Sequence, residues 1–413
     1  MEMRAAKGKT IKLILILILS AQAIFLCWLC ASCARARVQS SGSILYQSPA
    51  SAGSQSIVAN DVVKAGGSIS QSTRVGACTR ADWLHDMMLA LGLITDEVAS
   101  EQHHAIFSTA FELGLIDSDV IYPYTTVTRE YAASTIVRAL GYEPRSLPFG
   151  VWDAKYGDDL MTLVYYGYFA PDEHDMIHPG YELTEDEFDS LIAELGAYRS
   201  LKGKQLLAFG DSIMFGTGND EIGIADLIAE KYDMKTADYS VAGATFGICK
   251  GRSHIADQVM DAADEIDSAD LILLDGATND FTHTAIGELS SGLTANANAQ
   301  DTFAGGMEYA MSLIRKNWPA APVVYIRAHN MGYFNDAIER KFGEFGLRIA
   351  DKWSASCVDI YSDTGFNTED ALIRDKYTYY REQLARADSV HPNALGYAVY
   401  YLPLISEAVC ELI

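Results

Sequence analysis

The second half of the chain alternates short apolar runs with longer amphipathic stretches, and this alternation restricts the fold more than any other feature. From Gly203 onward the sequence predicts strands over 204–209, 235–241, 271–274, 322–326 and 357–361. It predicts helices over 222–232, 255–263, 302–317, 336–353, 368–387 and 394–412. Strands that alternate with helices form a mostly parallel sheet through crossover connections. We therefore expect an α/β domain over residues 203–413, with its site beyond the carboxyl ends of the strands.

Two distant segments contain the residue types that nucleophilic catalysis needs. Ser212 follows the first predicted strand, and Asp388 and His391 stand three residues apart on an expected short loop that stops at Pro392. Serine becomes a nucleophile only with a base in hydrogen-bond reach and a third group that orients the base. The sequence thus predicts Ser212, Asp388 and His391 as catalytic residues. Capping of a turn by Ser212, and of its own loop by Asp388, is the simpler structural alternative.

Gly243 and Asn279 follow the next two predicted strands, so they should meet Ser212 at one edge of the sheet. Glycine lets backbone approach a substrate closely, and an asparagine amide donates without adding charge. We expect an oxyanion hole formed by Ser212, Gly243 and Asn279. For Asn279 the alternative is an ordinary turn. His283 and His329 also lie near strand ends and are candidates for lining the pocket.

Four segments in this half together resemble the sequence blocks of the SGNH (GDSL-like) hydrolases. They are residues 210–213, 238–245, 277–280 and 388–393. The resemblance implies a three-layer α/β/α, flavodoxin-like sheet domain with the catalytic and oxyanion residues named above. Two positions depart from the family pattern, because Ala277 stands where Gly is usual and Asp238 where Asn is usual. Both concern loop geometry, and Ala277 can shift the loop that carries Asn279.

Residues 75–200 contain a degenerate repeat. Thr79, Thr128 and Thr184 each precede a helical pattern, at separations of 49 and 56 residues. Each threonine can cap its helix, and acidic residues three positions after the first and third complete capping boxes. A glycine near the end of each pattern is a predicted C-cap: Gly92, Gly141 and Gly196. A further helix is predicted before the motif in two units, over 105–115 and 158–169.

The repeat resembles the S-layer homology module, a small and mostly helical domain whose units bind secondary cell-wall polymers of Gram-positive bacteria. By this resemblance Arg80 and Arg129 contact anionic sugar groups, for which the forked guanidinium is well suited. Glu185 occupies the equivalent position in the third unit. The alternative is an ordinary helical domain in which the Thr-Arg pairs only cap helices.

The N-terminus predicts export. Residues 1–36 contain several basic residues followed by 22 uncharged residues from Leu13 to Ala34, and Ala34-Arg35-Ala36 offers a cleavage site. The segment is also long enough to be an uncleaved membrane anchor. Residues 37–74 are rich in Ser, Gly and Gln and are interpreted as a flexible linker. We expect an extracellular or cell-surface protein.

Composition narrows the possible partners. The formal net charge of −24 argues against nucleic acid as a partner. Four cysteines lie beyond the N-terminal segment without metal-binding spacing, and they are interpreted as mostly buried apolar side chains, with a Cys249–Cys357 bridge as the alternative. No HExxH motif or dense His/Asp cluster occurs, so we expect neither a metal nor another cofactor.

The sequence is best interpreted as an exported serine esterase that removes acyl groups, above all acetyl, from carbohydrate or cell-wall glycan. Other small esters, including lipid and aryl esters, stay open as substrates. An O-acyltransferase that uses the same three catalytic residues is the first alternative. A cell-wall-binding or adhesion protein with an inactive hydrolase-like domain is the second.

Overall fold

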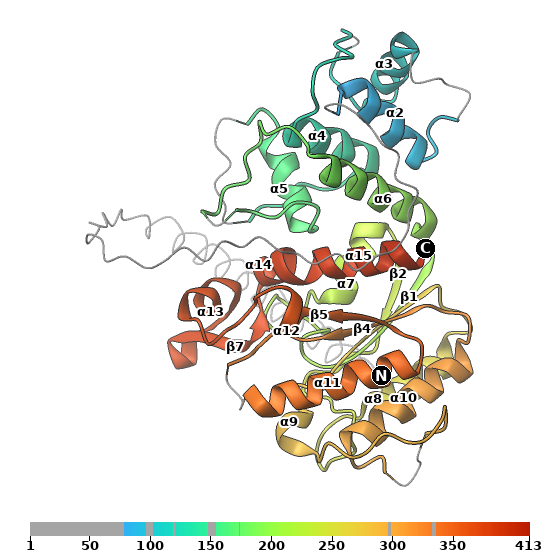
Figure 1. Ribbon diagram of the computed structural model, residues 1–413, viewed down its shortest axis with the longest axis vertical. Helices are drawn as coiled ribbons and strands as arrows, with labels where there is room; N and C mark the ends of the chain where they lie inside the picture. Colours follow the sequence, from blue (N-terminus) through green and yellow to red (C-terminus); the bar gives the residue numbers. More distant parts are fainter. Residues whose placement is uncertain are drawn as a thin grey trace, which may run out of the picture. The chain divides into compact units, whose positions relative to one another are not determined.

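The computed structural model describes most of the chain after the predicted leader and linker, which lie outside the described residues. Arg74–Ile413 form one compact unit. In Figure 1 its helical part runs from blue to green, and the α/β part continues to red. Within the described part of the chain, no helix is long and apolar enough to span a bilayer. The described residues are 78–95, 102–118, 120–147, 154–172, 174–295, 299–332 and 336–413.

The α/β part is built on a five-stranded sheet in the order β2-β1-β3-β4-β5. All neighbouring strands are parallel, as the alternation of strands and helices predicted. Because β2 and β3 lie on opposite sides of β1, the chain changes direction across the sheet at β1, which is where α/β folds place their ligands. The strands are β1 Gln205–Phe209, β2 Lys235–Asp238, β3 Leu271–Asp275, β4 Val323–Arg327 and β5 Ser356–Asp359.

Helices cover both faces of this sheet (Figure 1), which confirms the three-layer α/β/α prediction. In β1, Leu206 and Ala208 face one helical layer while Leu207 and Phe209 face the other. Both faces are therefore buried, which explains the continuous apolar runs of the strands. One layer holds α7 Ile224–Tyr232 and α15 Leu402–Leu412, and the other holds α8 Ile255–Glu265, α10 Phe303–Asn317 and α11 Asp336–Lys352.

The predicted helix over 368–387 is wrong in its second half. The α-helix α13 covers Ala371–Tyr377, and an antiparallel hairpin of β6 Thr378–Arg381 and β7 Arg386–Pro392 follows it. The aromatic and β-branched residues of β6 favour a strand, and Ala385 turns the hairpin with φ at +50°. Asp388 and His391 therefore lie in a strand rather than in the expected loop.

The remainder of the C-terminus is helical, as predicted. It consists of α14 Ala394–Gly396, the π-helical turn η2 Tyr397–Tyr401 and α15. The remaining short elements of the α/β part are α9 Asp280–His283, α12 Ile360–Asp363 and the 3₁₀ turn η1 Glu382–Leu384.

The threonine repeat is visible as a structural repeat. Thr79, Thr128 and Thr184 each accept a backbone hydrogen bond at the start of a helix, and the first and third form complete capping boxes. Equivalent isolated bridges join consecutive units, since Thr79 pairs with Thr126 and Thr128 with Glu182. The helices are α2 Arg80–Ala90, α3 His103–Glu112, α4 Arg129–Leu140, α5 Gly157–Tyr165 and α6 Glu185–Leu201.

Helix α6 belongs to the cores of both parts. Gly141 caps α4 in the left-handed conformation as predicted, but Gly196 does not end α6, which continues to Leu201. The reason lies in its packing, because Leu191 packs in the helical core whereas Tyr198 packs in the α/β core. The third repeat thus leads without a linker into β1.

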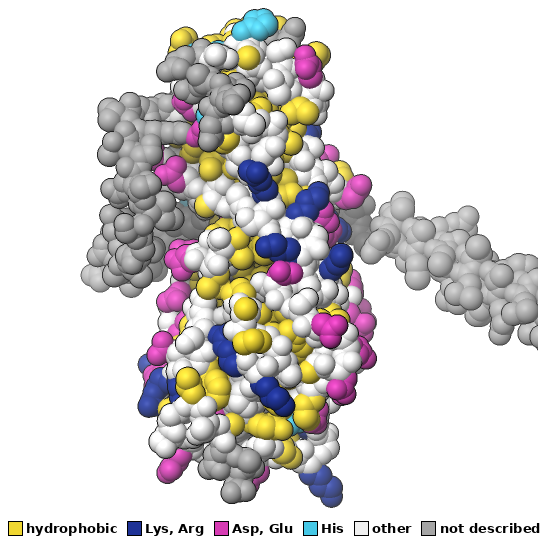
Figure 2. Space-filling view, turned by 90° about the vertical axis from the view of Figure 1, so that its right-hand side faces the viewer, with side chains coloured by type: hydrophobic (Ala, Val, Ile, Leu, Met, Phe, Trp, Pro, Cys, Tyr) yellow, Lys and Arg dark blue, Asp and Glu magenta, His cyan; other side chains and the backbone are white. Residues whose placement is uncertain are grey.

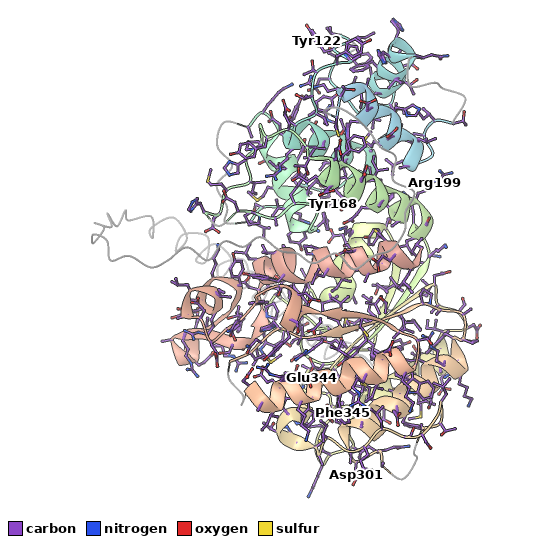
Figure 3. All side chains as sticks on the ribbon, in the orientation of Figure 1. Tyr122, Tyr168, Arg199, Asp301, Glu344 and Phe345 are labelled. Atoms are coloured by element: carbon purple, nitrogen blue, oxygen red, sulfur yellow. The ribbon has the colours of Figure 1, made fainter. Side chains whose placement is uncertain are left out.

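A buried ion pair reinforces this junction. Lys231 of α7 is fully buried, and its Nζ lies 2.5 Å from Glu194 of α6 and donates to Ser406 of α15 at 2.7 Å. Tyr168, labelled in Figure 3, presents its ring to the same Nζ at 4.1 Å. Burial lowers the pKa of Lys231, and the Glu194 carboxylate opposes that effect. Three helices from both parts therefore meet at the Lys231 ammonium, whose charge is balanced by Glu194.

The strong negative charge is not gathered into one patch on the face that Figure 2 presents. Acidic side chains are scattered over that face, with Lys and Arg side chains between them. The four cysteines of the described residues are free, so the conceivable Cys249–Cys357 bridge is not formed.

Candidate active site

The turn after β1 fixes the backbone around Ser212. The Asp211 N–H donates to Asp275 Oδ1 at 2.9 Å, and the Ile213 N–H donates to Asp211 Oδ1 at 3.0 Å. Gly210 is required here, because an added Cβ would lie 1.7 Å from Asp275 Oδ1. Among the described residues no acceptor is recorded for the Ser212 N–H, which leaves it for a substrate oxygen.

The three predicted catalytic side chains are brought together in one line. His391 Nε2 lies 2.9 Å from Ser212 Oγ, and His391 Nδ1 lies 2.7 Å from Asp388 Oδ2. The other carboxylate oxygen, Asp388 Oδ1, accepts the backbone N–H groups of Val390 and His391 at 2.8 and 2.7 Å. With Nδ1–H held by the carboxylate, neutral His391 presents Nε2 as an acceptor to the Ser212 hydroxyl.

The electrostatics of Asp388 favour its charged form. Burial opposes ionisation of this carboxyl, but the hydrogen bonds from the His391 ring and from the backbone N–H groups outweigh burial. Together they hold the pKa of Asp388 well below its ordinary value. The side chain can therefore orient His391 as a carboxylate over the whole range in which proteins are stable.

Three further buried carboxyls support the loops of the site. Burial raises the pKa of Asp211, and burial together with the Asp211 charge raises that of Asp275 well above its ordinary value. Asp280 accepts the N–H groups of Phe246 and Gly247, both at 2.9 Å, which ties the loop after Gly243 to the loop after β3. Burial raises the pKa of Asp280 to about 6.

Asn279 contacts Asp211, the residue before Ser212, but its amide is already engaged. Its Nδ2 donates to Asp211 Oδ2 at 3.1 Å and to the Ala244 carbonyl at 3.0 Å. The Gly243 N–H, in contrast, has no recorded acceptor among the described residues. Ala277 adopts φ +89°, a left-handed conformation that favours glycine. The loop after β3 thus keeps at Ala277 the backbone conformation that glycine normally adopts.

A comparison with protein families identifies the domain that carries this site. A model of the GDSL-like lipase/acylhydrolase family matches residues 208–399, which include the five predicted catalytic and oxyanion residues. Residues 208–399 are a GDSL-like lipase/acylhydrolase (SGNH) domain. This hydrolase domain is an enzyme that acts on ester bonds. The matched range lies within the α/β part, beyond the threonine repeat.

Solved structures similar to the chain cover about half of it. A Lactobacillus plantarum protein has 19% identity, covers 51% of this chain and 97% of its own, and has a TM-score of 0.41. A carbohydrate acetylesterase from Sinorhizobium meliloti has 13% identity, 51% and 100% coverage, and a TM-score of 0.35. A phospholipase A1 from Streptomyces albidoflavus has 18% identity, 50% and 99% coverage, and a TM-score of 0.34. No curated protein sequence matches the chain significantly.

Two arginines of the hydrolase domain, which the sequence did not single out, contact these groups. Arg252 Nη1 donates to the Gly243 carbonyl at 2.8 Å and reaches Asn279 Oδ1 at 3.4 Å, so it links the two oxyanion loops. Its Nη2 lies 2.9 Å from Nε2 of exposed His283. Arg381 of β6 donates from Nε to Asp388 Oδ2 at 2.6 Å. No local motif marks either arginine, and Arg381 fell within the predicted helix.

Two other supports of the site also went unnoticed in the sequence. Gln258 of α8 bonds both the N–H and the carbonyl of Gly210 at 2.9 Å, and Asp275 holds the Asp211 N–H.

His329, a predicted pocket residue, is buried behind the hydrolase site, with Nδ1 2.7 Å from the Tyr401 hydroxyl and Nε2 3.2 Å from the Ser389 carbonyl. Burial lowers the pKa of His329 to about 4.

The guanidinium groups of the two predicted wall-binding arginines differ in whether other protein groups already bind them. Arg129 donates to Glu187 Oε1 from Nε at 3.0 Å and from Nη2 at 2.6 Å, and its Nη1 donates to the Ile177 carbonyl at 2.9 Å. Its guanidinium is therefore occupied inside the helical part. Arg80 instead lies 4.3 Å above the Tyr131 ring and lines a groove of about 420 Å³.

Proposed function

We propose that this protein is an exported serine esterase whose hydrolase domain removes small acyl groups, acetyl above all, from carbohydrate. The observation that carries the proposal is the continuous line from Ser212 Oγ through the His391 ring to Asp388, with separations of 2.9 and 2.7 Å. In this proposal Ser212 is the nucleophile, His391 the general base, and Asp388 the group that orients and stabilises the base.

The reaction runs in two halves. Ser212 Oγ attacks the ester carbonyl while His391 Nε2 takes its proton, and the N–H groups of Ser212 and Gly243 receive the developing oxyanion. The imidazolium then protonates the leaving alcohol oxygen as the C–O bond breaks, which leaves an acyl-serine. Water attacks this ester as His391 Nε2 takes its proton, and the imidazolium then returns that proton to Ser212 Oγ as the C–O bond breaks and the acid leaves. Asn279 adds a third donor when the oxyanion displaces one of its present acceptors.

The surroundings of the nucleophile support a small acyl group. Ser212 is only 6% exposed. On its histidine side the wall is tight, because a Cβ on Gly218 would lie 2.4 Å from the Pro392 carbonyl oxygen and 2.9 Å from His391 Cβ. Tyr379 and Tyr380 are exposed on β6, beside the catalytic strand, and exposed tyrosines are suited to stacking on sugar rings.

The test compares hydrolysis of p-nitrophenyl acetate, its octanoate and an acetylated xylo-oligosaccharide by the wild type and by Ser212→Ala. The proposal expects acetate and the oligosaccharide to be cleaved, octanoate to be poor, and Ser212→Ala to lose at least about a thousandfold. Ser268→Ala, an exposed serine far from the site, is the control and should match the wild type. Equal rates for Ser212→Ala and the wild type would sink the esterase proposal.

We further propose that export places the enzyme at the cell surface and that the helical part binds anionic cell-wall polymer through the groove beside Arg80. Exposed Tyr122 offers a stacking surface in this groove, and because Lys155 is paired with Asp117, the guanidinium of Arg80 is the group that suits an acidic glycan. The test is retention on purified cell wall of Arg80→Ala and of Arg129→Gln. Reduced retention for Arg80→Ala with a normally retained Arg129→Gln supports the groove, and normal retention of Arg80→Ala refutes it.

A further inference from the structure

One oxygen of Asp388 is shared by two side chains rather than one. Besides the bond from His391 Nδ1, Asp388 Oδ2 receives Nε of Arg381 at 2.6 Å and lies 2.6 Å from its Nη2. The same Nη2 is 3.3 Å from His391 Nδ1. Because the Nδ1 proton already points to the carboxylate, this last approach places a positive charge beside the imidazole without a hydrogen bond between the two.

We propose that Arg381 is a positioning residue of the catalytic group, which immobilises the Asp388 carboxylate and sets the acidic limit of activity by disfavouring protonation of His391. The inference rests on the proposed esterase function. Arg381 lies on β6 and Asp388 on β7, so the hairpin itself brings them together across the antiparallel register, in which Tyr380 pairs with Ala387 and Arg381 with Arg386.

The positioning effect follows from the number of donors around the carboxylate. Oδ1 is held by two backbone N–H groups, and Oδ2 by the His391 ring and the Arg381 fork. Asp388 is only 6% exposed, so its orientation is set by these donors rather than by water. A planar guanidinium that binds through two nitrogens restricts the carboxylate more than a lysine ammonium does.

The effect on acidity follows from the charges that face the imidazole. Asp388 and Arg381 face His391 from the hairpin, Asp211 acts from the turn after β1, and His329 acts from the end of β4. His329 is neutral above about pH 4, because burial lowers its pKa to about 4. Within the described residues, Arg381 is thus the permanent cation of this group, since a guanidinium does not lose its proton. Its charge lies beside the imidazole and opposes formation of the imidazolium.

The experiment measures kcat/KM against pH on p-nitrophenyl acetate for the wild type, Arg381→Gln, Arg381→Lys and Arg386→Gln. Arg381→Gln should move the acid-side half-activity point upward by about one pH unit, which is about tenfold in rate on that limb, and lower the plateau. Arg381→Lys keeps the positive charge but not the planar guanidinium. Its half-activity point on the acid side should therefore stay in place, while its maximal kcat/KM falls. Arg386→Gln changes an exposed arginine of the same hairpin and should match the wild type.

A second measurement does not depend on turnover. NMR titration of the His391 ring in the Ser212→Ala background, with and without Arg381→Gln, should show the same upward displacement. If that displacement appears although the wild type hydrolyses none of the three test esters, the esterase proposal fails and the role of Arg381 stands. An unmoved acid limb and an unmoved titration, with activity reduced equally at every pH, would show that Arg381 is merely structural. If Arg381→Gln does not fold and Arg381→Lys does, a shift of one full pH unit in the acid-side half-activity point of Arg381→Lys would overturn the proposal.

Discussion

Asn279 Nδ2 donates to Asp211 Oδ2 at 3.1 Å, which ties the loop after β3 to the residue that precedes the nucleophile. The bond orients the amide, since Asn279 Oδ1 then faces the Arg252 guanidinium. It also shows that the two loops at the change of strand order form one connected polar structure rather than two independent turns. Changes in either loop should therefore reach the reaction.

The strained loop predicts which side chains position 277 can accept. Ala277 has φ +89° and is buried, so Ala277→Val adds a β-branched side chain in a conformation that it strongly disfavours. We expect Ala277→Val to lower the free energy of unfolding by at least about 3 kcal/mol. Ala277→Gly should change it by less than about 1 kcal/mol, because relief of strain offsets the lost methyl contacts and the greater chain entropy. Urea denaturation measures both, and equal stabilities for the two variants would contradict the reading of this loop.

The link between the oxyanion loops predicts a kinetic effect of Arg252. Arg252→Ala removes the contacts with the Gly243 carbonyl and Asn279 Oδ1, so both loops lose a fixed separation. We expect kcat to fall about tenfold to a hundredfold with little change in KM, because the loss concerns groups that act in the transition state. Steady-state kinetics of Arg252→Ala test this, with exposed Lys250→Ala as the control. A change in KM alone would mean that Arg252 supports binding of the substrate and of the transition state equally, which would contradict a role confined to the transition state.

The junction between the helical and α/β parts predicts a strong stability effect. Lys231→Met removes the partner of Glu194, whose carboxylate then stays nearly buried without a countercharge. We expect the free energy of unfolding to fall by about 3–5 kcal/mol. The double variant Lys231→Met/Glu194→Leu should regain most of that loss, because it buries no unpaired charge. Denaturant titration of the two variants measures both free energies of unfolding. A double variant no more stable than Lys231→Met would contradict the role assigned to the buried Lys231–Glu194 ion pair.

Buried His329 predicts a loss of stability in mild acid. Its folded pKa of about 4 lies below the ordinary 6.5, so the unfolded chain gains a proton at higher pH than the folded chain does. Stability therefore falls as the pH drops from about 6.5 to about 4, by about 3 kcal/mol from this group. Asp280 acts in the opposite direction, since burial raises its pKa to about 6.

The comparison with His329→Gln isolates the histidine from the other groups. This variant keeps a hydrogen-bonding side chain beside Tyr401 but does not titrate. Its free energy of unfolding should decrease less between pH 7 and pH 4 than that of the wild type, by about 3 kcal/mol. Parallel stability profiles for the two proteins would show that His329 is not buried as a neutral ring.

The central strands of the sheet were predictable from sequence because β1, β3 and β4 are buried on both faces. Leu206 to Phe209 show this directly, since each residue contacts one of the two helical layers and the run is uniformly apolar. The hairpin was missed because good helix formers flank β6 in the sequence, although the aromatic and β-branched residues of β6 itself favour a strand. Gly196 was misjudged because packing of α6 on the α/β core overrides a local stop signal.

The candidate site divides in the same way. Ser212, His391 and Asp388 were found because their residue types carry the chemistry in recognisable blocks. Arg252, Arg381 and Asp275 were not found, because each acts through a partner brought near by tertiary structure. Arg381 illustrates this best, since its contact with Asp388 exists only when the hairpin forms.

The most direct test of the central claim is the mass of the protein after reaction with a serine-reactive organophosphonate. The account predicts a single adduct, located on Ser212 by peptide mapping. It also predicts no adduct in Ser212→Ala and labelling slowed by at least about a hundredfold in His391→Ala, because the nucleophile then lacks its base. An adduct that survives in Ser212→Ala, or labelling of Ser212 at an equal rate in His391→Ala, would contradict it.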